Sequence, residues 1–399
     1  MRSRLHHVIG LLALGALAAA APAHAQTVVK VGVILTYSGP EASLGETIDR
    51  GIKLWMKEHG KDLPSDIKVE LIRRDDTGPK PEVAKQLVHD LVVQDKVNLL
   101  TGVVWSPNAA AIAPLTKEAK LPFIIMNAAG AAIVRISPYV ARVSFTLWQS
   151  SYPLGKWAAT HNLKRVYTAV SDFIPGHDGE AAFAKGFKES GGTIVDSVRF
   201  PLASPDLAPY FQRVKDSKPD ALYVFVPGGP QSTNVIKTFK QLALADAGIK
   251  LIGPMDITIE NELPNMGDAA LGVLTMGSYS SDGDRPANKA FVEAWHKEYG
   301  ATSYPDFLSL GGWDGMAAIF DVIKKQNGKI DPDKTMELLK GWKTESPRGP
   351  ISIDPETRDV VQNEYMREVK KVGDHTANVE FETVGSFKDP WKEFNPPKQ

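Results

Sequence analysis

Short runs of β-branched and other apolar residues alternate with helical apolar spacing in the first part of the chain. Val28–Leu35 is the first such run, and helical spacing follows over Ser43–Glu58. Strand-like runs at Ile67–Ile72 and Val97–Leu100 then flank a predicted helix at Pro81–Gln94. Strands buried on both faces of a parallel sheet have this composition, and the connecting helices cover those faces. The β-α-β-α-β order with short loops predicts a doubly wound α/β sheet.

The alternation restarts after Val140–Val143, which interrupts the rhythm. The second set of predicted elements has helices at Ser151–His161, Gly179–Ser190, Asp206–Lys215 and Gln231–Ala243, and strands at Arg165–Val170, Thr193–Val198, Ala221–Val226 and Ile249–Ile252. Because both sets share one design, we predict two α/β lobes. A chain of 399 residues is long enough for two or three domains.

The last third of the chain changes its pattern twice. We expect 271–276 and 278–281 to return to the first lobe. Helices are then predicted at Pro286–Tyr299, Pro305–Lys325 and Asp331–Leu339. Past Gly349-Pro350, period-two alternation predicts antiparallel strands at Ile351–Ile353, Tyr365–Val372 and Val379–Phe387. The proline-containing segment 389–399 is predicted to be an extended tail.

The amino-terminal segment has the pattern of a secretory signal peptide. Arg2 and Arg4 precede the apolar run Val8–Ala21, and Ala23-His24-Ala25 forms a small-residue cleavage site. The apolar run is too short for a comfortable membrane span. We therefore expect residues 1–25 to be removed after Ala25 and the protein to be periplasmic. The sequence has no cysteine, which excludes disulfides, thiolate metal sites and a lipid-anchored amino-terminal cysteine.

Composition and motifs argue against several classes of function. The formal net charge is -1, so nothing favours nucleic-acid binding through a basic face. The sequence after the signal segment lacks a Walker loop, a dinucleotide-binding glycine motif, a zinc-protease motif and a nucleophile elbow. The histidines form no metal-ligand cluster, and we expect no cofactor and no metal. Asp75 and Asp76 fit turn caps better than an acid/base pair, and Asp282, Asp284 and Asp314 fit surface turns or helix caps.

Ser106-Pro107 stands where a helix is predicted to begin, after a strand and its loop. Ser106 suits the N-cap and Pro107 the first helical position. The free N–H groups and positive dipole of this end suit a carboxylate. The small-residue turn Met126–Gly130 would bring a second backbone edge to the carboxyl end of the next strand, where open α/β sheets bind ligands. A plain helix cap remains the alternative.

Some aromatic residues stand in predicted loops at strand ends. Trp105, Trp148 and Phe173 are in such positions, and each is equally compatible with a pocket wall and with simple packing. His177 follows Phe173 in the same loop and fits a solvated residue better than a ligand contact.

The chain from Val28 to about Gln362 resembles the periplasmic solute-binding proteins of ABC transporters, in the branched-chain amino-acid family. The resemblance rests on the order and spacing of K-V-G-V-I-L-T-Y-S-G-P (30–40), R-D-D-T-G-P-K-P (74–81), T-G-V-V-W-S-P (101–107), L-P-F-I-I (121–125), G-V-L-T (272–275) and R-G-P-I-S-I-D (348–354). It implies the type I fold, in which two doubly wound α/β lobes are joined by a three-segment hinge and close on a solute. It also implies a membrane permease as partner and, we expect, a monomer.

On this resemblance, the crossovers lie near Val143–Thr146, Leu274–Tyr279 and Pro350–Asp354. Lobe 1 then comprises 26–143 and 277–350. Lobe 2 comprises 144–276 and 351–388. Such a cleft gives affinity through desolvation and a few fixed polar groups.

The resemblance also implies site residues. Amino-acid binders of this family hold the ligand carboxylate with a serine at the position of Ser106 and a threonine at that of Gly130. They hold the ammonium with the carbonyl at Ala128, an acid near Met255–Asp256, and tyrosines at the positions that read Gly176 and Pro227 here. With Met255 expected in the acid's place, a buried ammonium would lack partners.

The expected ligand is therefore a carboxylate with an apolar, aromatic body, such as a benzoate or phenylpropenoate. Ser106 and the backbone of Ala128–Gly130 would hold the carboxylate. The predicted ligand-binding residues are Leu44, Trp105, Ser106, Asn127, Ala128, Ala129, Gly130, Phe145, Phe173, Gly176, His177, Pro227, Met255 and Asp256. Branched-chain or other amino-acid binding, an amide or urea-type ligand sensor, and a periplasmic enzyme remain the alternatives. The missing nucleophile–base pair disfavours the enzyme.

Overall fold

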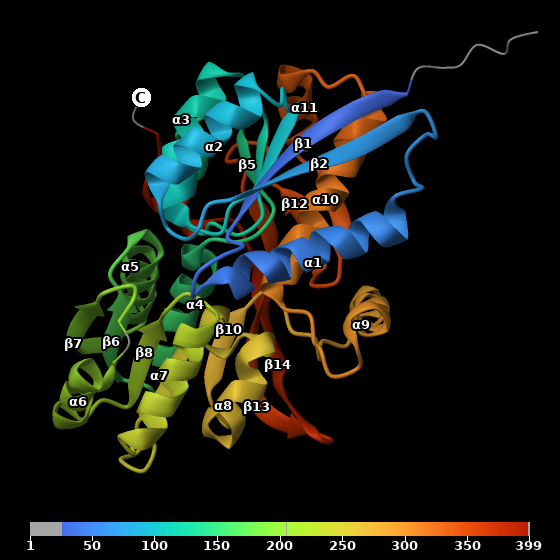
Figure 1. Cartoon of the computed structure of the whole chain (residues 1–399). Coiled ribbons are helices and arrows are strands. Elements are labelled where there is room, and N and C mark those ends of the chain that lie inside the picture. The colour runs from blue at the N-terminus through green and yellow to red at the C-terminus, as the bar shows by residue number, and fades with distance from the viewer. Residues whose placement is uncertain (1–25, 205, 398–399) are drawn as a thin grey trace, which may run out of the picture.

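Two lobes, each built around a parallel sheet, make up the computed structural model of this chain (Figure 1). The structure describes residues 26–204 and 206–397. The predicted signal peptide at 1–25 and the last two residues of the predicted tail lie outside the described residues. No helix in the described ranges has the length and apolar character needed to cross a membrane.

The first lobe contains a five-stranded, all-parallel sheet in the order β2-β1-β3-β4-β5. Its strands are β1 (Thr27–Leu35), β2 (Ile67–Asp75), β3 (Leu99–Gly102), β4 (Phe123–Ile125) and β5 (Val140–Arg142). Successive side chains of β1 enter different cores. Val33 and Leu35 face one apolar cluster, and Ile34 faces another. This alternation confirms the prediction of a strand buried on both faces.

Helices cover both faces of the first sheet. They are α1 (Ala42–His59), α2 (Pro81–Val93), α3 (Ser106–Glu118), α10 (Phe307–Lys325) and α11 (Pro332–Leu339). Ile48 of α1 and Ile319 of α10 share the core of Val33, while Val88 of α2 and Ile112 of α3 share the core of Ile34. The last helices return to this lobe from far along the sequence (Figure 1).

The second sheet runs β7-β6-β8-β9-β10 in parallel and continues through antiparallel β13 to β12 and β11, with β14 also on β13. The strands are β6 (Arg165–Ser171), β7 (Thr193–Phe200), β8 (Ala221–Phe225), β9 (Lys250–Pro254), β10 (Leu274–Gly277), β11 (Lys343–Ser346), β12 (Gly349–Ile353), β13 (Val360–Val372) and β14 (His375–Phe387). The helices with this lobe are α4 (Leu147–Thr160), α5 (Ile174–Glu189), α6 (Ala208–Ser217), α7 (Pro230–Gln241) and α8 (Leu263–Met266). Helix α9 (Pro286–Tyr299) has its predicted bounds.

The expected return of 271–276 to the first lobe is wrong. Strand β10 pairs with β9 and β13 in the second sheet, and 278–281 contain no strand. Arg367 of β13 fixes β10 there, because its guanidinium donates to Thr275 Oγ1 at 3.0 Å and to the carbonyl oxygen of Tyr279 at 2.6 Å.

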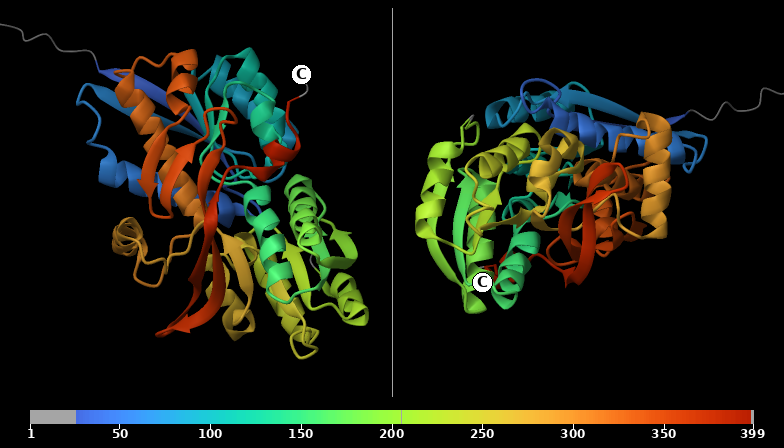
Figure 2. Two further views of the ribbon diagram at one scale, coloured as in Figure 1. Left: turned by 180° about the vertical axis from the view of Figure 1, so that it is seen from behind. Right: turned by 90° about the horizontal axis from the view of Figure 1, so that it is seen from below.

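The third crossing between the lobes runs along β13 itself. Its first residues, Val360 and Val361, pair with β12, whereas Tyr365–Glu368 pair with β10 (Figure 2). The preceding turn, assigned to lobe 2 in our expectation, instead contacts the first lobe. The carbonyl oxygen of Arg358 accepts the backbone N–H of Arg142, and the Arg358 guanidinium donates to the carbonyl oxygen of Val140 at 3.0 Å. The predicted boundary between the lobes at 350/351 is therefore wrong for this turn, because Arg358 is hydrogen-bonded to β5, the edge strand of the first sheet.

Asp314 is not the surface cap that its sequence context predicts. It lies buried in α10, and its carboxylate receives the Arg348 guanidinium at 2.6 Å. Arg348 also donates to the carbonyl oxygens of Val143 and Ser144, where the chain first leaves lobe 1. This pair therefore ties the first crossing to the segment before β12.

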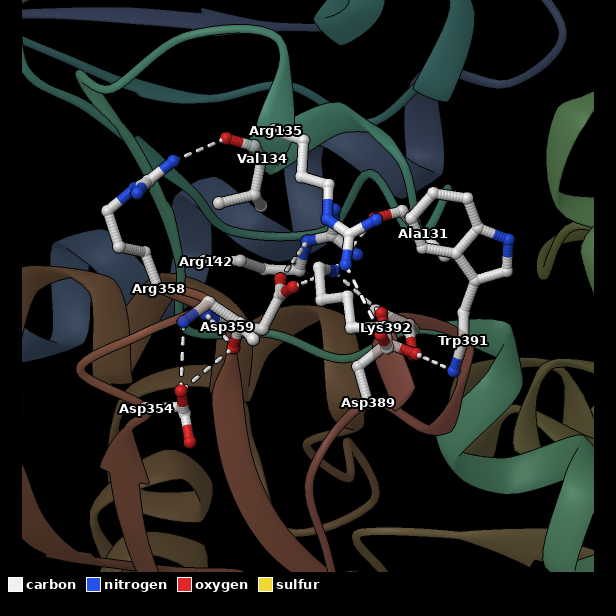
Figure 3. A network of polar contacts seen from close by, with 12 residues as sticks. Ala131, Val134, Arg135, Arg142, Asp354, Arg358, Asp359, Asp389, Trp391 and Lys392 are labelled. Atoms are coloured by element: carbon white, nitrogen blue, oxygen red, sulfur yellow. Dashed lines mark hydrogen bonds and ion pairs between the residues drawn. The ribbon is translucent and has the colours of Figure 1, made fainter. Parts of the chain in front are cut away.

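The predicted extended tail contains a short helix, α12 (Pro390–Phe394), and is anchored. Lys392 is buried and donates to Asp359, to Asp389 at 2.7 Å and to the carbonyl oxygen of Ala131 at 2.8 Å. Arg142 lies 3.4 Å from Asp359 in the same group (Figure 3). The tail is ordered because its lysine supplies the cation that these carboxylates need once they are out of water.

A buried carboxyl stands on β13 where the strand passes between the lobes. Glu364 accepts from Gln362 Nε2 at 3.2 Å, while its Oε2 has no hydrogen-bond partner. Burial raises the pKa of Glu364 to about 8, against the smaller lowering effects of Gln362, Arg348 and Arg367. The Glu364 carboxyl therefore binds its proton more tightly in the folded protein than in the unfolded chain.

Stability should fall as the pH rises from about 4.5 towards 8, because folding then requires a buried charge or a bound proton. In Glu364→Gln this contribution disappears. We expect its urea midpoint to fall less between pH 6 and pH 9 than that of the wild type. An equal fall in both proteins would show that Glu364 does not titrate in this way.

Candidate functional site

A cavity lies between the two lobes, where the carboxyl ends of both sheets meet. About 390 Å³ of space that protein atoms do not fill lies within and at the mouth of this cavity, part of it open to solvent. The lining residues are Leu44, Val104, Trp105, Ser106, Asn127, Ala129, Phe145, Leu147, Phe173, Pro175, Phe225, Pro227, Gly228, Asp256, Phe307 and Leu308. Most of them come just after a strand ends, which is where open α/β sheets place ligands.

Helix N-termini from both lobes face this cavity. Lining residues stand in the first turns of α1, α3, α4, α5 and α10, and Gly228 just precedes α7. Free N–H groups and aligned peptide dipoles make these ends positive. No lysine or arginine is among the lining residues, and Asp256 is the one lining residue whose side chain can carry a charge. The cavity therefore favours an anion through dipoles rather than through a formal positive charge.

Ser106 lines the cavity but does not cap the helix, so that part of the prediction is wrong. Helix α3 begins at Ser106 itself, and Trp105 occupies the N-cap with no capping side-chain bond. The Ser106 hydroxyl oxygen instead accepts the backbone N–H of Gly130 at 3.0 Å. Because that bond uses the oxygen as acceptor, the hydroxyl proton stays available for a ligand oxygen.

Gly130 supports Ser106 rather than lining the cavity. Its N–H is donated to Ser106, and its carbonyl oxygen accepts from Arg142 at 2.7 Å. A Cβ at this position would lie 2.9 Å from Ile174 Cγ2 of the other lobe. A threonine at this position, which the resemblance implies for amino-acid binders, would therefore collide with Ile174. Ala128 is also buried off the cavity, and its N–H donates to the carbonyl oxygen of Val103.

Aromatic rings form the walls of the cavity. Phe145 meets Phe307 edge-on with ring centroids 5.4 Å apart, and Phe173 stacks on Phe225 at 5.9 Å. Such faces and edges suit a planar apolar ligand body. Trp148 does not take part, because it lies inside α4 and packs near Phe394.

A chain of hydrogen bonds holds Trp105 in place. Its indole N–H donates to Thr36 Oγ1 at 2.9 Å, and Thr36 donates to Asp76 at 2.7 Å. Asp76 also accepts the N–H of Gly78, and Asp75 that of Thr77, which confirms the turn-cap prediction for both carboxylates. A fixed indole pre-organises this wall.

The two lobes touch at the cavity rim. Gly229, at φ +79°, lets the start of α7 approach α1 so closely that a Cβ there would lie 3.2 Å from Leu44 Cδ2. Asp178 of α5 accepts the N–H of Ala131 at 2.9 Å across the same division. The two lobes are therefore in contact with each other around the cavity.

Asp256, not Met255, occupies the cavity wall opposite lobe 1, so the expectation that Met255 replaces the acid is wrong. Both residues belong to a 3-10 turn, Met255–Thr258, that follows β9. Asp256 lines the cavity, whereas Met255 packs against Gly277. Burial raises the pKa of Asp256 to about 7, against smaller lowering by its own backbone N–H and by Arg367.

Two predicted residues lie away from the cavity. Gly176 is buried within α5 against Ser171, and His177 is partly exposed, with its Nε2 2.6 Å from Asp172 Oδ1. The loop prediction failed because α5 begins at Ile174, which turns both residues away. Together, Ala128, Gly130, Gly176, His177 and Met255 do not line the cavity.

Nine predicted residues do meet at the cavity: Leu44, Trp105, Ser106, Asn127, Ala129, Phe145, Phe173, Pro227 and Asp256. The lining residues missed from sequence are Val104, Leu147, Pro175, Phe225, Gly228, Phe307 and Leu308. Phe225 ends β8, so the strand-end rule could have found it. Phe307 and Leu308 carried no such signal, because only the tertiary fold returns α10 to the cleft. The described residues contain no group of three or more His, Asp or Glu side chains placed to hold a metal.

Comparison with known proteins agrees with this geometry. The family model described as "periplasmic binding protein" matches residues 28–374. A Leu/Ile/Val-binding protein homolog from Brucella melitensis is 42% identical, over 96% of this chain and 98% of its own.

Solved structures are similar over nearly the whole fold. An ABC-transporter solute-binding protein from Rhodopseudomonas palustris BisB5, in complex with 3,4-dihydroxybenzoic acid, is 47% identical with a TM-score of 0.88, covering 92% of this chain and 99% of that one. A second, from strain HaA2 in complex with p-hydroxybenzoic acid, is 42% identical with a TM-score of 0.86, covering 89% and 96%. The chain belongs to the periplasmic binding protein family, in its two-lobed type I form.

Proposed function

We propose that this protein binds an aromatic carboxylate of the benzoate type in the periplasm and delivers it to an ABC-transporter permease. The observation that carries the proposal is the cavity itself. Its walls are aromatic, Ser106 offers a hydroxyl proton, and no lysine or arginine lines it. Two relatives of this fold are complexed with hydroxylated benzoic acids, which supports the same ligand class.

The proposal includes the protein's location and state. Gln26 is the first residue after the proposed cleavage site, and the exported chain acts as a monomer that binds without catalysis. An intact-mass measurement of the exported protein tests the cleavage, since a mass that retains residues 1–25 would contradict it.

Calorimetry against a ligand panel tests the function. Benzoate, 4-hydroxybenzoate and p-coumarate are compared with leucine under the same conditions. We expect tight binding of at least one aromatic acid and little heat from leucine. Tight leucine binding with no aromatic response would overturn the proposal.

Amino-acid binding is the second candidate, because one observation favours it. Asp256 places a carboxyl on the cavity wall, where an ammonium could pair with it. Against it, Gly130 cannot supply the threonine hydroxyl, and the tyrosine positions read Gly176 and Pro227. The leucine arm of the calorimetry separates the two candidates.

Replacing Ser106 with alanine should weaken binding of the aromatic acid by about 1–3 kcal/mol, the range for leaving a buried hydrogen-bonding group without its partner. The variant removes the hydroxyl proton offered to the carboxylate and also leaves the Gly130 N–H without its acceptor. Calorimetry with the tightest ligand of the panel measures the loss.

Ser232→Ala is the matched control. Ser232 stands in the first turn of α7, but it donates to the carbonyl oxygen of Gly229 and does not line the cavity. We expect the dissociation constant of this variant to stay within about twofold of the wild-type value, which is a difference in binding free energy smaller than RT. Unchanged affinity in Ser106→Ala would place the anion elsewhere.

A further inference from the structure

The cavity holds three side chains with polar groups to spare for a ligand. Ser106 and Asn127 come from lobe 1, and Asp256 comes from lobe 2. The remaining polar side chain of the lining, Trp105, already donates its indole N–H to Thr36 Oγ1. A ligand held between the lobes therefore meets the Ser106 hydroxyl and the unpaired Asn127 Oδ1 on one side and a carboxyl on the other.

The Asp256 carboxyl has fewer hydrogen-bond partners among the described residues than its two oxygens can accept. The residue is 5% exposed, and its Oδ2 is buried without a hydrogen-bond partner. Arg367, the nearby cation, directs its donors to Thr275, Tyr279 and Glu260 instead. Leaving a buried acceptor unpaired is costly, and such groups in native proteins call for an explanation.

The charge of the ligand fixes which of its ends meets Asp256. A benzoate carboxylate beside a second carboxyl would be repelled whenever both are ionised, so it belongs at the Ser106 side. The opposite end of the ring then points to the wall formed by lobe 2. A phenolic hydroxyl there keeps its proton at neutral pH and donates to a carboxyl oxygen in either protonation state.

We propose that Asp256 accepts a hydrogen bond from a ring hydroxyl of the ligand and makes this protein selective for hydroxylated over unsubstituted benzoates. The inference rests on the proposed function and narrows its substrate class. Phe145, Phe173, Phe225 and Phe307 would enclose the ring between the two polar ends.

The test compares two ligands that differ by one hydroxyl. Dissociation constants for benzoate and 4-hydroxybenzoate are measured by calorimetry in the wild type, Asp256→Leu and Asp256→Asn. We expect the wild type to prefer 4-hydroxybenzoate at least about tenfold, since a site built for a hydroxyl discriminates strongly against its absence. In Asp256→Leu the preference should shrink to within about threefold, while benzoate binds as well as before or better. Asp256→Asn keeps a carbonyl acceptor and should retain part of the preference.

Glu260→Gln is the matched control. Glu260 lies shortly after Asp256, is equally buried beside Arg367, and does not line the cavity. Its removal should leave the ratio of the two dissociation constants unchanged. Benzoate binding by each variant also shows that the variant has folded.

The outcomes separate the inference from the proposed function. An unchanged preference in Asp256→Leu overturns the role of Asp256 and leaves aromatic-acid binding intact. Failure of the wild type to bind either ligand overturns the proposed function itself. If the wild type binds leucine alone and Asp256→Leu abolishes that binding, Asp256 is an ammonium partner and the inference is wrong.

Discussion

Replacing Arg348 with alanine is expected to lower the free energy of unfolding by about 3–5 kcal/mol, the range for breaking one partner out of a buried ion pair. The guanidinium is 4% exposed and lies 2.6 Å from the Asp314 carboxylate. It also donates to the carbonyl oxygens of Val143 and Ser144 at 2.6 and 2.7 Å, and to Gln362 Oε1 at 2.5 Å. The variant strands a buried carboxylate and several acceptors at once.

Urea unfolding followed by circular dichroism measures this loss. Arg199→Ala is the control, because the Arg199–Glu180 pair is a surface pair with a half-exposed arginine. Such pairs contribute about 0–1 kcal/mol. A loss in Arg348→Ala no larger than in the control would mean that water replaces the guanidinium readily.

Replacing Lys392 with alanine should cost a similar amount, about 3–5 kcal/mol. The Lys392 ammonium is buried between Asp359 and Asp389 and also binds the carbonyl oxygen of Ala131. Burial raises the pKa of Asp389, and Lys392 opposes that rise. Without the lysine the pKa of Asp389 rises further. At low pH Asp389 is therefore protonated, and its charge is no longer buried without a partner. The loss should therefore be larger at pH 8 than at pH 5.

Urea unfolding at both pH values tests this expectation. Lys371→Ala is the control, since Lys371 pairs with Asp268 on the surface. If both variants lose equally little unfolding free energy, Lys392 does not anchor the carboxyl-terminal segment. The segment would then be the extended tail that the sequence predicts.

The fold was accessible from the sequence because its strands are buried on both faces. Runs such as Val28–Leu35 indicate buried strands through their short length and their β-branched residues, and helical spacing follows them. The observed bounds of β1 differ from the predicted ones by one residue, and helix α9 matches its prediction. Parallel topology then placed the cavity at the strand ends, which is why Ser106, Asn127 and Phe173 could be chosen beforehand.

The details that failed depend on contacts distant in sequence or on the phase of a single turn. Met255 and Asp256 differ by one position, and the 3-10 turn alone decides which of them lines the cavity. Phe307 enters the cavity through a crossing that no local pattern reveals. Lys392 has an ordinary surface sequence context, and its burial depends on Asp359, which lies 33 residues earlier.

The lack of lysine and arginine among the cavity residues has a consequence for transport. A solute held by peptide dipoles and hydrogen bonds makes no ion pair that dissolved electrolyte could screen. Under the proposed function, solute binding by this protein should then respond weakly to ionic strength. When the lobes part, water alone can rehydrate the departing anion, with no counter-ion needed to take its place.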